Sequence, residues 1–144
     1  MTYAAFIISV VMVLLYIGYI QFYTKSTKRI NQLVLIELIV LNRNNFESIV
    51  NEIGFMLHDE KLFNKDIIEN KQSQMKCLYE SHLNNYDLLC YFVLNNQVDK
   101  KWFKENYLKS VFDCVENELF EGKSNIYQNI MAVYKKYKKW DNNE

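Results

Sequence analysis

The residues of this chain that could bind a metal or transfer a proton are spread along the sequence. His58 and His82 are the two histidines, and neither has a second His, Cys or carboxylate three or four residues on, as a zinc motif requires. The sequence His58-Asp59-Glu60 is acidic, but it follows an apolar pattern as a solvated helix end does. We therefore predict no metal site and no cofactor.

The cysteines and glycines give no stronger signal for catalysis. The three cysteines Cys77, Cys90 and Cys114 are odd in number and unevenly spaced, which favours reduced thiols buried as small apolar groups. No G-x-S-x-G motif or glycine-rich phosphate loop is present, and the carboxylates show no spacing that pairs a general acid with a base. The sequence therefore predicts a protein that is not an enzyme.

The elements that position these side chains begin with an apolar run over residues 4–20, interrupted only by Ser9 and Gly18. Tyr3 and Tyr23 bracket this run, and at 1.5 Å per residue they lie about 30 Å apart, the hydrocarbon thickness of a bilayer. A cleaved signal peptide is the alternative, but the run has no basic residue before it and no small-residue cleavage site after it. We predict a transmembrane anchor over residues 1–24.

Basic residues follow the run and none precedes it, so the positive-inside rule puts residues 25–144 in the cytosol. We therefore expect a single-pass membrane protein whose C-terminal domain is cytosolic. With zero prolines and three glycines, the part after the anchor is predicted to be all-α, a bundle of five or six helices joined by short loops. The formal net charge of zero argues against nucleic acid as a partner.

Apolar spacing places the helices. Residues 30–41 are apolar on every side, which favours a core helix, with a membrane-surface or oligomer-facing helix as the alternative. An amphipathic helix over residues 46–57 follows, with Asn44 and Glu47 spaced as a capping box. Within residues 66–94 we expect a break or cap at Asn84-Asn85, with one continuous helix as the alternative.

Three further helix boundaries are expected in the last third of the chain. A loop over residues 95–97 is followed by Asp99, which can cap the next helix. Gly122 sits where a C-terminal cap belongs, and Ser124 can start the last helix.

The stretch Leu83-Asn84-Asn85-Tyr86-Asp87-Leu88-Leu89, followed by Asn96-Gln97-Val98-Asp99-Lys100-Lys101-Trp102-Phe103, resembles a group of small bacterial proteins of unknown function. Those proteins have one N-terminal membrane helix and a compact helical domain, and some lie near defence or mobile-element genes. The resemblance therefore implies a location in the bacterial inner (cell) membrane and a defence setting. Asn85, Asp87, Val98 and Asp99 are the corresponding positions. The chain departs from the pattern in having Asp87 where Glu is usual and no glycine near Asn96.

Helix capping alone accounts for the residues of this motif. The side-chain oxygen of Asn84 or Asn85 can cap a helix, and Asp87 in a first turn favours the helix dipole and accepts from free backbone amides. A polar cluster in a binding groove is the alternative.

Two surfaces are candidates for membrane contact. One follows the anchor and the other is the basic and aromatic C-terminal end, where lysines alternate with rings of the kind that lie on an anionic leaflet. A helix that ends its core face there, with solvated lysines, is the alternative. The candidate membrane-surface residues are Lys25, Lys28, Arg29, Lys135, Lys136, Lys138, Lys139 and Trp140.

Self-association is expected because a domain of this size rarely covers a helix that is apolar all round. Ile36 and Ile39 are the candidate contact residues there, and Ala5 and Ser9 have the small-xxx-small spacing that brings membrane helices together. Two hypotheses follow. The first is a non-enzymatic membrane-anchored module that acts by homo-oligomerisation or by binding a protein partner. The second is a membrane-tethered sensor that binds a small molecule or nucleotide. Aromatic residues such as Tyr86, Tyr91, Trp102 and Tyr107 could line its pocket, although at helical spacing such residues are more typical of a core.

Overall fold

The chain folds into helices joined by short turns. The computed structural model describes residues 3–58 and 65–141, and for residues 3–8, 140 and 141 it describes the backbone alone. Within these ranges there are five α-helices, one 3-10 turn and no strand. The all-α prediction is therefore confirmed for the described part of the chain.

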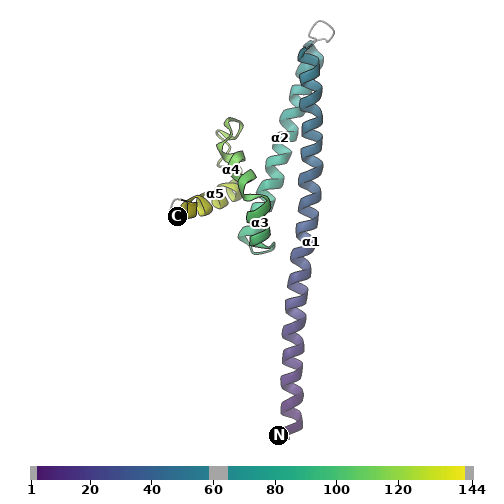
Figure 1. Ribbon diagram of the computed structural model, residues 1–144, viewed down its shortest axis with the longest axis vertical. Helices are drawn as coiled ribbons and strands as arrows, with labels where there is room; N and C mark the ends of the chain where they lie inside the picture. The colour runs from purple at the N-terminus through teal and green to yellow at the C-terminus, as the bar shows by residue number, and fades with distance from the viewer. Residues whose placement is uncertain (1–2, 59–64, 142–144) are drawn as a thin grey trace.

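Helix α1 (Tyr3–His58) is a single element of 56 residues, and Figure 1 shows it as a long rod whose N-terminal half stands alone. The predicted separate helices over residues 30–41 and 46–57 are therefore wrong as separate elements. The capping box is also wrong, because Glu47 forms an ion pair with Arg43 at 2.7 Å and Asn44 lies in mid-helix. No proline interrupts these residues, and the i, i+4 ion pair supports the helix through its polar stretch.

Residues 30–41 are not buried on every side, as the sequence led us to expect. Leu35 and Ile39 are buried, but the opposite face of α1 stays open. Among the described helices, α2 makes the main contact with α1, so it covers one stripe of the rod. The exposed apolar side chains are Ile30, Leu33, Val34, Leu38, Val40 and Leu41, at 37–61% exposure.

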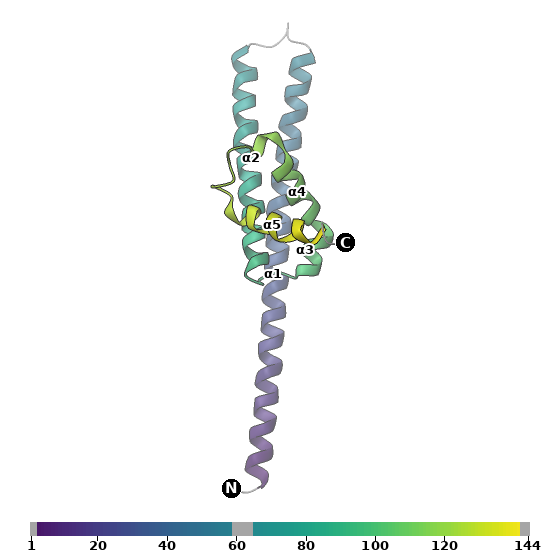
Figure 2. The same ribbon diagram turned by 90° about the vertical axis from the view of Figure 1, so that its left-hand side faces the viewer.

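Helix α2 (Lys65–Leu94) is continuous, which confirms the one-helix alternative for residues 66–94. It runs antiparallel to the C-terminal half of α1 (Figures 1 and 2). Polar groups fix the register of this pair. Asn42 Nδ2 donates to Ser81 Oγ at 2.7 Å, Asn85 Nδ2 donates to the Leu38 carbonyl at 3.3 Å, and Lys71 pairs with Glu52 at 2.6 Å.

The loop after α2 has the conformation that its asparagines favour. Asn96 has a φ of 57°, and the amide of Gln97 donates to the Phe92 carbonyl at 2.8 Å, which closes the helix as a Schellman motif does. Asn tolerates the left-handed region better than other non-glycine residues, so it replaces the glycine that the resemblance led us to expect. Asp99 then caps α3 (Lys100–Asn106) by accepting from the amide of Trp102 at 2.8 Å, as predicted.

Helix α4 (Leu108–Glu116), the 3-10 turn η1 (Glu118–Phe120) and α5 (Gln128–Asp141) complete the chain. Gly122 follows η1 with a φ of 77°, in a turn rather than at the end of an α-helix. Ser124 does not start the last helix. The amides of Ile126 and Tyr127 both donate to the Lys123 carbonyl, and these turns delay α5 until Gln128.

Helix α2 is the centre of the fold. It lies between α1 and the group formed by α3, α4 and α5, and α5 crosses it rather than running along it (Figures 1 and 2). Its five buried side chains therefore meet apolar groups from both sides. The core consists of Leu35, Ile39, Leu83, Tyr86, Leu89, Cys90, Val93, Val98, Phe103, Val111, Phe120, Tyr127, Ile130, Val133 and Tyr137.

The N-terminal half of α1 has no part in this core. Large apolar side chains between Val10 and Tyr23 are 43–74% exposed. Over the residues that the structure describes, we find no helix whose length and hydropathy would let it cross a membrane. The predicted run over residues 4–20 starts in residues 4–8, whose side chains lie outside the described part.

Candidate functional site

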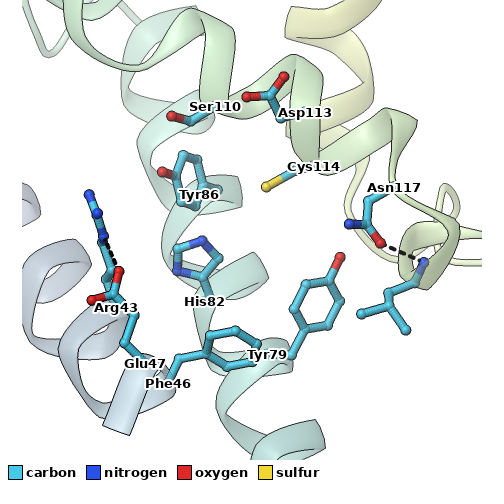
Figure 3. A pocket seen from close by; sticks show the side chains of 11 residues that line it. Arg43, Phe46, Glu47, Tyr79, His82, Tyr86, Ser110, Asp113, Cys114 and Asn117 are labelled. Atoms are coloured by element: carbon cyan, nitrogen blue, oxygen red, sulfur yellow. Dashed lines mark hydrogen bonds and ion pairs between the residues drawn. The ribbon is translucent and has the colours of Figure 1, made fainter. Parts of the chain in front are cut away.

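A pocket of about 430 Å³ lies where α1, α2 and α4 converge (Figure 3). Its volume falls within the range of small-molecule sites. Residues from the three helices and from the start of η1 form its walls. They are Arg43, Phe46, Glu47, Tyr79, His82, Tyr86, Ser110, Asp113, Cys114, Asn117 and Leu119.

Helical periodicity brings these side chains together. On α2, Tyr79, His82 and Tyr86 follow one another at i, i+3 and i+7, so they share one face. On α4, Ser110, Asp113 and Cys114 are spaced at i, i+3 and i+4. The α2 face is therefore the floor between two walls, as Figure 3 shows, and it carries two phenol rings and an imidazole.

Two buried polar atoms in this pocket, Tyr79 Oη and His82 Nδ1, have no hydrogen-bond partner among the described residues. Such atoms are uncommon in folded proteins, because a buried polar group without a partner loses its hydration and gains nothing. Asn117 differs from them, since its Oδ1 accepts from the amide of Leu119 at 2.9 Å. The two unpartnered atoms therefore mark where the site could meet a ligand.

The imidazole of His82 packs edge-on against Tyr86, with ring centroids 4.7 Å apart. Burial lowers the pKa of His82 below its ordinary value of 6.5, and the positive charge of Arg43 lowers it further. Both causes disfavour the imidazolium form. His82 is therefore a neutral group at pH 7, able to donate from one ring nitrogen and accept at the other.

The cysteines differ in exposure. Cys77 is exposed, which corrects the prediction that all three are buried, whereas Cys90 is buried in the core. Burial raises the pKa of the Cys114 thiol to about 11, with a smaller contribution from Asp113, and it raises the pKa of Cys90 still more. Both remain thiols at neutral pH and are poor nucleophiles.

We expect His82 to make the protein less stable in mild acid. Because its pKa is lower in the folded than in the unfolded chain, the unfolded state takes up a proton first as the pH falls below 6.5. The stability contribution is complete above that pH and is lost below it, toward the folded-state pKa. The measurement is the thermal midpoint from about pH 7.5 to about pH 5.5, the range in which histidine titrates.

The variant His82→Phe should flatten this dependence by removing the titrating group. His58→Phe makes the same chemical change at the exposed last residue of α1, so it should retain the slope of the parent. A parent-like slope in His82→Phe would show that other groups govern stability in this range.

The candidate membrane-surface residues lie in two places. Lys25 and Arg29 are exposed on α1, and Lys28 Nζ donates to Asn96 Oδ1 at 3.4 Å where the α2–α3 loop meets α1. Lys135, Lys136, Lys138 and Lys139 are exposed on α5, and the side chain of Trp140 lies outside the described residues. Lys138 hydrogen bonds to Tyr134 and pairs with Glu116 at 3.4 Å. Figure 2 shows the C-terminal end of α5 beside α3, toward the end of the bundle from which α1 projects.

The candidate assembly residues also lie in two separate parts of α1. Ile39 is 4% exposed in the core and Ile36 is half-buried, so neither is a main element of the exposed face. Ser9 is exposed on the free part of α1, and the side chain of Ala5 lies outside the described residues. Leu33 and Val40, in the same segment, are exposed apolar residues. The sequence did not indicate them as contact residues because it predicted burial on every side of this helix.

The Asn85–Asp87 motif is structural, but not in the way its position in the sequence suggests. Both residues lie inside α2, which does not break there. Asp87 Oδ1 accepts from the amides of Asn129 at 3.0 Å and Ile130 at 3.1 Å, and Asp87 Oδ2 accepts from Asn129 Nδ2 at 2.7 Å. Asp87 therefore caps α5 rather than its own helix.

Sequence reasoning missed the pocket. Of the aromatic residues it proposed as a lining, only Tyr86 is there. Trp102 and Tyr107 pack on each other with centroids 5.1 Å apart, and Tyr91 is 43% exposed. The i, i+3, i+7 spacing of Tyr79, His82 and Tyr86 was the available signal. Comparison of the chain with protein-family models, with curated proteins and with solved structures finds no match.

Proposed function

We propose that this protein is a non-enzymatic interaction module, anchored in the bacterial inner membrane by α1, that acts by self-association. The exposed apolar face of α1 over residues 30–41 carries the proposal. Soluble monomers rarely leave such a contiguous patch open to water. A role in bacterial defence is implied only by the resemblance to small bacterial membrane-anchored proteins.

The anchor is supported by the continuity of α1. The helix extends without a break from the apolar N-terminal run to the bundle, and its N-terminal part stands clear of the other helices (Figures 1 and 2). Lys28 then hydrogen bonds to Asn96 in the α2–α3 loop. Exposed side chains such as Leu14, Leu15 and Phe22, at 62–74%, would be stabilised in hydrocarbon. Lys25, Lys28 and Arg29 follow at the level where phosphate headgroups would lie.

The occupant of the exposed face, in this proposal, is a second copy of the chain. A shared membrane holds all copies parallel and at one depth, so the same residues of two α1 rods stand side by side. Confinement also raises the effective concentration, so a modest interface is enough. Leu33, Glu37 and Val40 follow the 3-4 spacing of a coiled-coil seam on this face.

A role without catalysis is supported by the chemistry of the pocket. Cys114 is held as a thiol by its raised pKa, and His82 Nδ1 has no carboxylate to orient it among the described residues. No group of three His, Cys, Asp or Glu residues in that same part is placed to hold a metal ion. These groups lack the activation that nucleophilic and general-base catalysis require.

Photo-crosslinking tests the self-association. The photoreactive residue p-benzoylphenylalanine in place of Leu33 should yield a dimer band when native membranes are irradiated, whereas the same residue in place of Asn84, exposed on α2, should not. Val40→Lys should weaken the band, because it adds a charge to the interface. Glu37→Leu should strengthen it, because two parallel copies would place like charges together.

Two results would contradict this interface. The first is a band of equal strength from the probes at residues 33 and 84. The second is an unchanged band in Val40→Lys. The double variant Ser73→Lys with Asn84→Lys, which adds charge to the exposed face of α2, is the control for charge alone and should leave the band intact.

The predicted topology has its own test, which uses the exposed thiol of Cys77. In intact cells a membrane-permeant maleimide should label Cys77, whereas an impermeant one should label it only after the inner membrane is opened. Labelling of intact cells by the impermeant reagent would place the helical domain on the outer side. Loss of the protein from membranes under alkaline carbonate washing would contradict the anchor itself.

The alternative of a membrane-tethered sensor is favoured by one observation, the pocket between α1, α2 and α4. A nucleotide is not the ligand that this pocket favours. Arg43 is the single basic residue in its lining, and Glu47 already pairs with it at 2.7 Å.

A further inference from the structure

The pocket between α1, α2 and α4 combines stacking surfaces with a small number of polar atoms. Phe46, Tyr79, His82 and Tyr86 contribute ring surfaces, and the centroids of Phe46 and Tyr79 lie 6.3 Å apart. Sites for small molecules are mostly apolar with a few polar groups that fix orientation. A flat ring is the shape that this lining accommodates best, because aromatic faces prefer offset or edge contacts with other rings.

The polar atoms of the pocket define which hydrogen-bonding groups a ring-shaped ligand must carry. Tyr79 Oη and His82 Nδ1 are both buried and lack partners in the described part of the chain. In Figure 3 the Tyr79 hydroxyl points toward the α4 side of the pocket, where Cys114 and Asn117 lie. A ring nitrogen or a ring N–H would supply the hydrogen bonds that these two atoms do not find in the fold.

The charges exclude an acidic ligand. Arg43 is offset by Glu47, and the lining adds the carboxylate of Asp113, so the three charged side chains sum to minus one. Lys123 Nζ lies 5.3 Å from the centroid of the Tyr79 ring, but it is paired with Glu80 at 3.6 Å. A phosphate or carboxylate would therefore find no unpaired cation among the residues described around the pocket, and it would face a like charge. A cation would instead be attracted by the carboxylates and by the face of Tyr86, since Lys123 already lies over the ring of Tyr79.

We propose that this pocket binds a small planar heteroaromatic molecule that is uncharged or carries one positive charge. The site is a feature of the bundle, so it does not depend on self-association through α1. Binding would give Tyr79 and His82 the partners that they lack. It would also bridge α1, α2 and α4, and a ligand that binds only the folded protein stabilises it.

The experiment titrates the full chain in detergent micelles with molecules that share a ring and differ in charge: indole, tryptamine and indole-3-acetate. Adenine and adenosine monophosphate are a second pair. The readout is the imidazole ¹⁵N resonance of His82, and His58 is an internal control because the chain has two histidines. We expect saturable shifts of His82 alone with an uncharged or cationic probe, and affinity at least about tenfold weaker for the matching anion.

Variants assign the binding to the pocket. Tyr79→Phe keeps the ring and removes one unpartnered hydroxyl, so it should weaken binding several-fold while the thermal midpoint without probe stays the same or rises. Tyr91→Phe makes the same change at an exposed residue of α2 and should leave the affinity unchanged. A thermal melt of each variant checks that it folds.

Three outcomes would overturn the proposal. One is no shift of His82 with any uncharged or cationic probe at millimolar concentration. Another is equal binding of indole-3-acetate and indole, or of adenosine monophosphate and adenine, because the charge argument would then be wrong. The third is unchanged affinity in Tyr79→Phe, which would place the ligand elsewhere. Any of them leaves the photo-crosslinking test of self-association unaffected.

Discussion

Val111→Asp should unfold the bundle, and it should leave the protein in the membrane fraction if α1 is the anchor that we propose. Val111 is 0% exposed on α4 and belongs to the core around α2. A carboxylate there has no cationic partner in the core and must either stay charged in an apolar environment or take up a proton. We expect a loss of about 4 kcal/mol or more, a large part of the 5–15 kcal/mol that stabilises a typical domain.

Urea unfolding followed by the fluorescence of Trp102, which packs against Tyr107, measures this loss. Far-ultraviolet circular dichroism alone would understate it, because α1 can stay helical in lipid or detergent. Val111→Thr has nearly the same shape and should cost about 1–3 kcal/mol, since it buries only a hydroxyl. Lys109→Asp introduces the same side chain on the exposed face of α4 and should stay within about 0.5 kcal/mol of the parent.

Ile53→Asp tests whether a charge buried in the α1–α2 hairpin lowers the free energy of unfolding as much as one buried in the central core. Ile53 is 8% exposed, but it lies outside the central core, toward the end of the hairpin where α1 and α2 pair with each other alone. Local opening of that end can hydrate the new charge without unfolding α3, α4 and α5. The loss should therefore be smaller than for Val111→Asp, and an equal loss would show that the hairpin and the rest of the bundle unfold as one unit.

The helical class was predictable because composition and apolar spacing both indicate it. A chain with no proline and few glycines has little that would break a helix, and its apolar spacing is helical. The joining of elements was harder to predict. Asn44 and Asn84-Asn85 are good capping residues, but in α1 and α2 they lie in mid-helix, where Asn85 bonds across to Leu38. Tertiary packing outweighed the local preference of these asparagines.

The pocket could not be predicted because three segments distant in sequence form it. Arg43, His82 and Cys114 come from different helices, and no local pattern says that these helices meet. The face formed by Tyr79, His82 and Tyr86 was visible as a spacing, but the same spacing also describes a core stripe. Tyr86 shows both outcomes at once, since it is buried in the core and also lines the pocket.

Asp87→Ala should release α5 from the bundle. The Asp87 carboxylate accepts three hydrogen bonds from the first turn of α5, at 2.7–3.1 Å. Removing it leaves backbone donors at a part-buried helix terminus and takes a negative charge from the positive end of the helix dipole. We expect a loss of about 3 kcal/mol of unfolding free energy, more than for a helix cap within a single segment.

The matched controls separate the tertiary cap from ordinary capping. Asp99→Ala removes the cap of α3, which acts within one segment, and should cost about 1 kcal/mol. Asp87→Asn keeps an oxygen for the two backbone amides but places an amide donor against Asn129, so its loss should be intermediate. If Asp87→Ala costs no more than Asp99→Ala, packing of Ile130, Val133 and Tyr137 holds α5 without the carboxylate.

Amide hydrogen exchange tests the structural role of the Asn85–Asp87 pair. In Asp87→Ala, exchange should accelerate at Asn129 and Ile130 and along α5, while the amides of α2 near Asn85 keep their protection. Asn85 bonds to α1 and Asp87 bonds to α5, so two residues of one helix turn hold α2 to its neighbours on opposite sides. If exchange accelerates only in α5, these bonds serve to hold α2 to its neighbouring helices. If exchange accelerates throughout α2, these bonds set the stability of the whole fold.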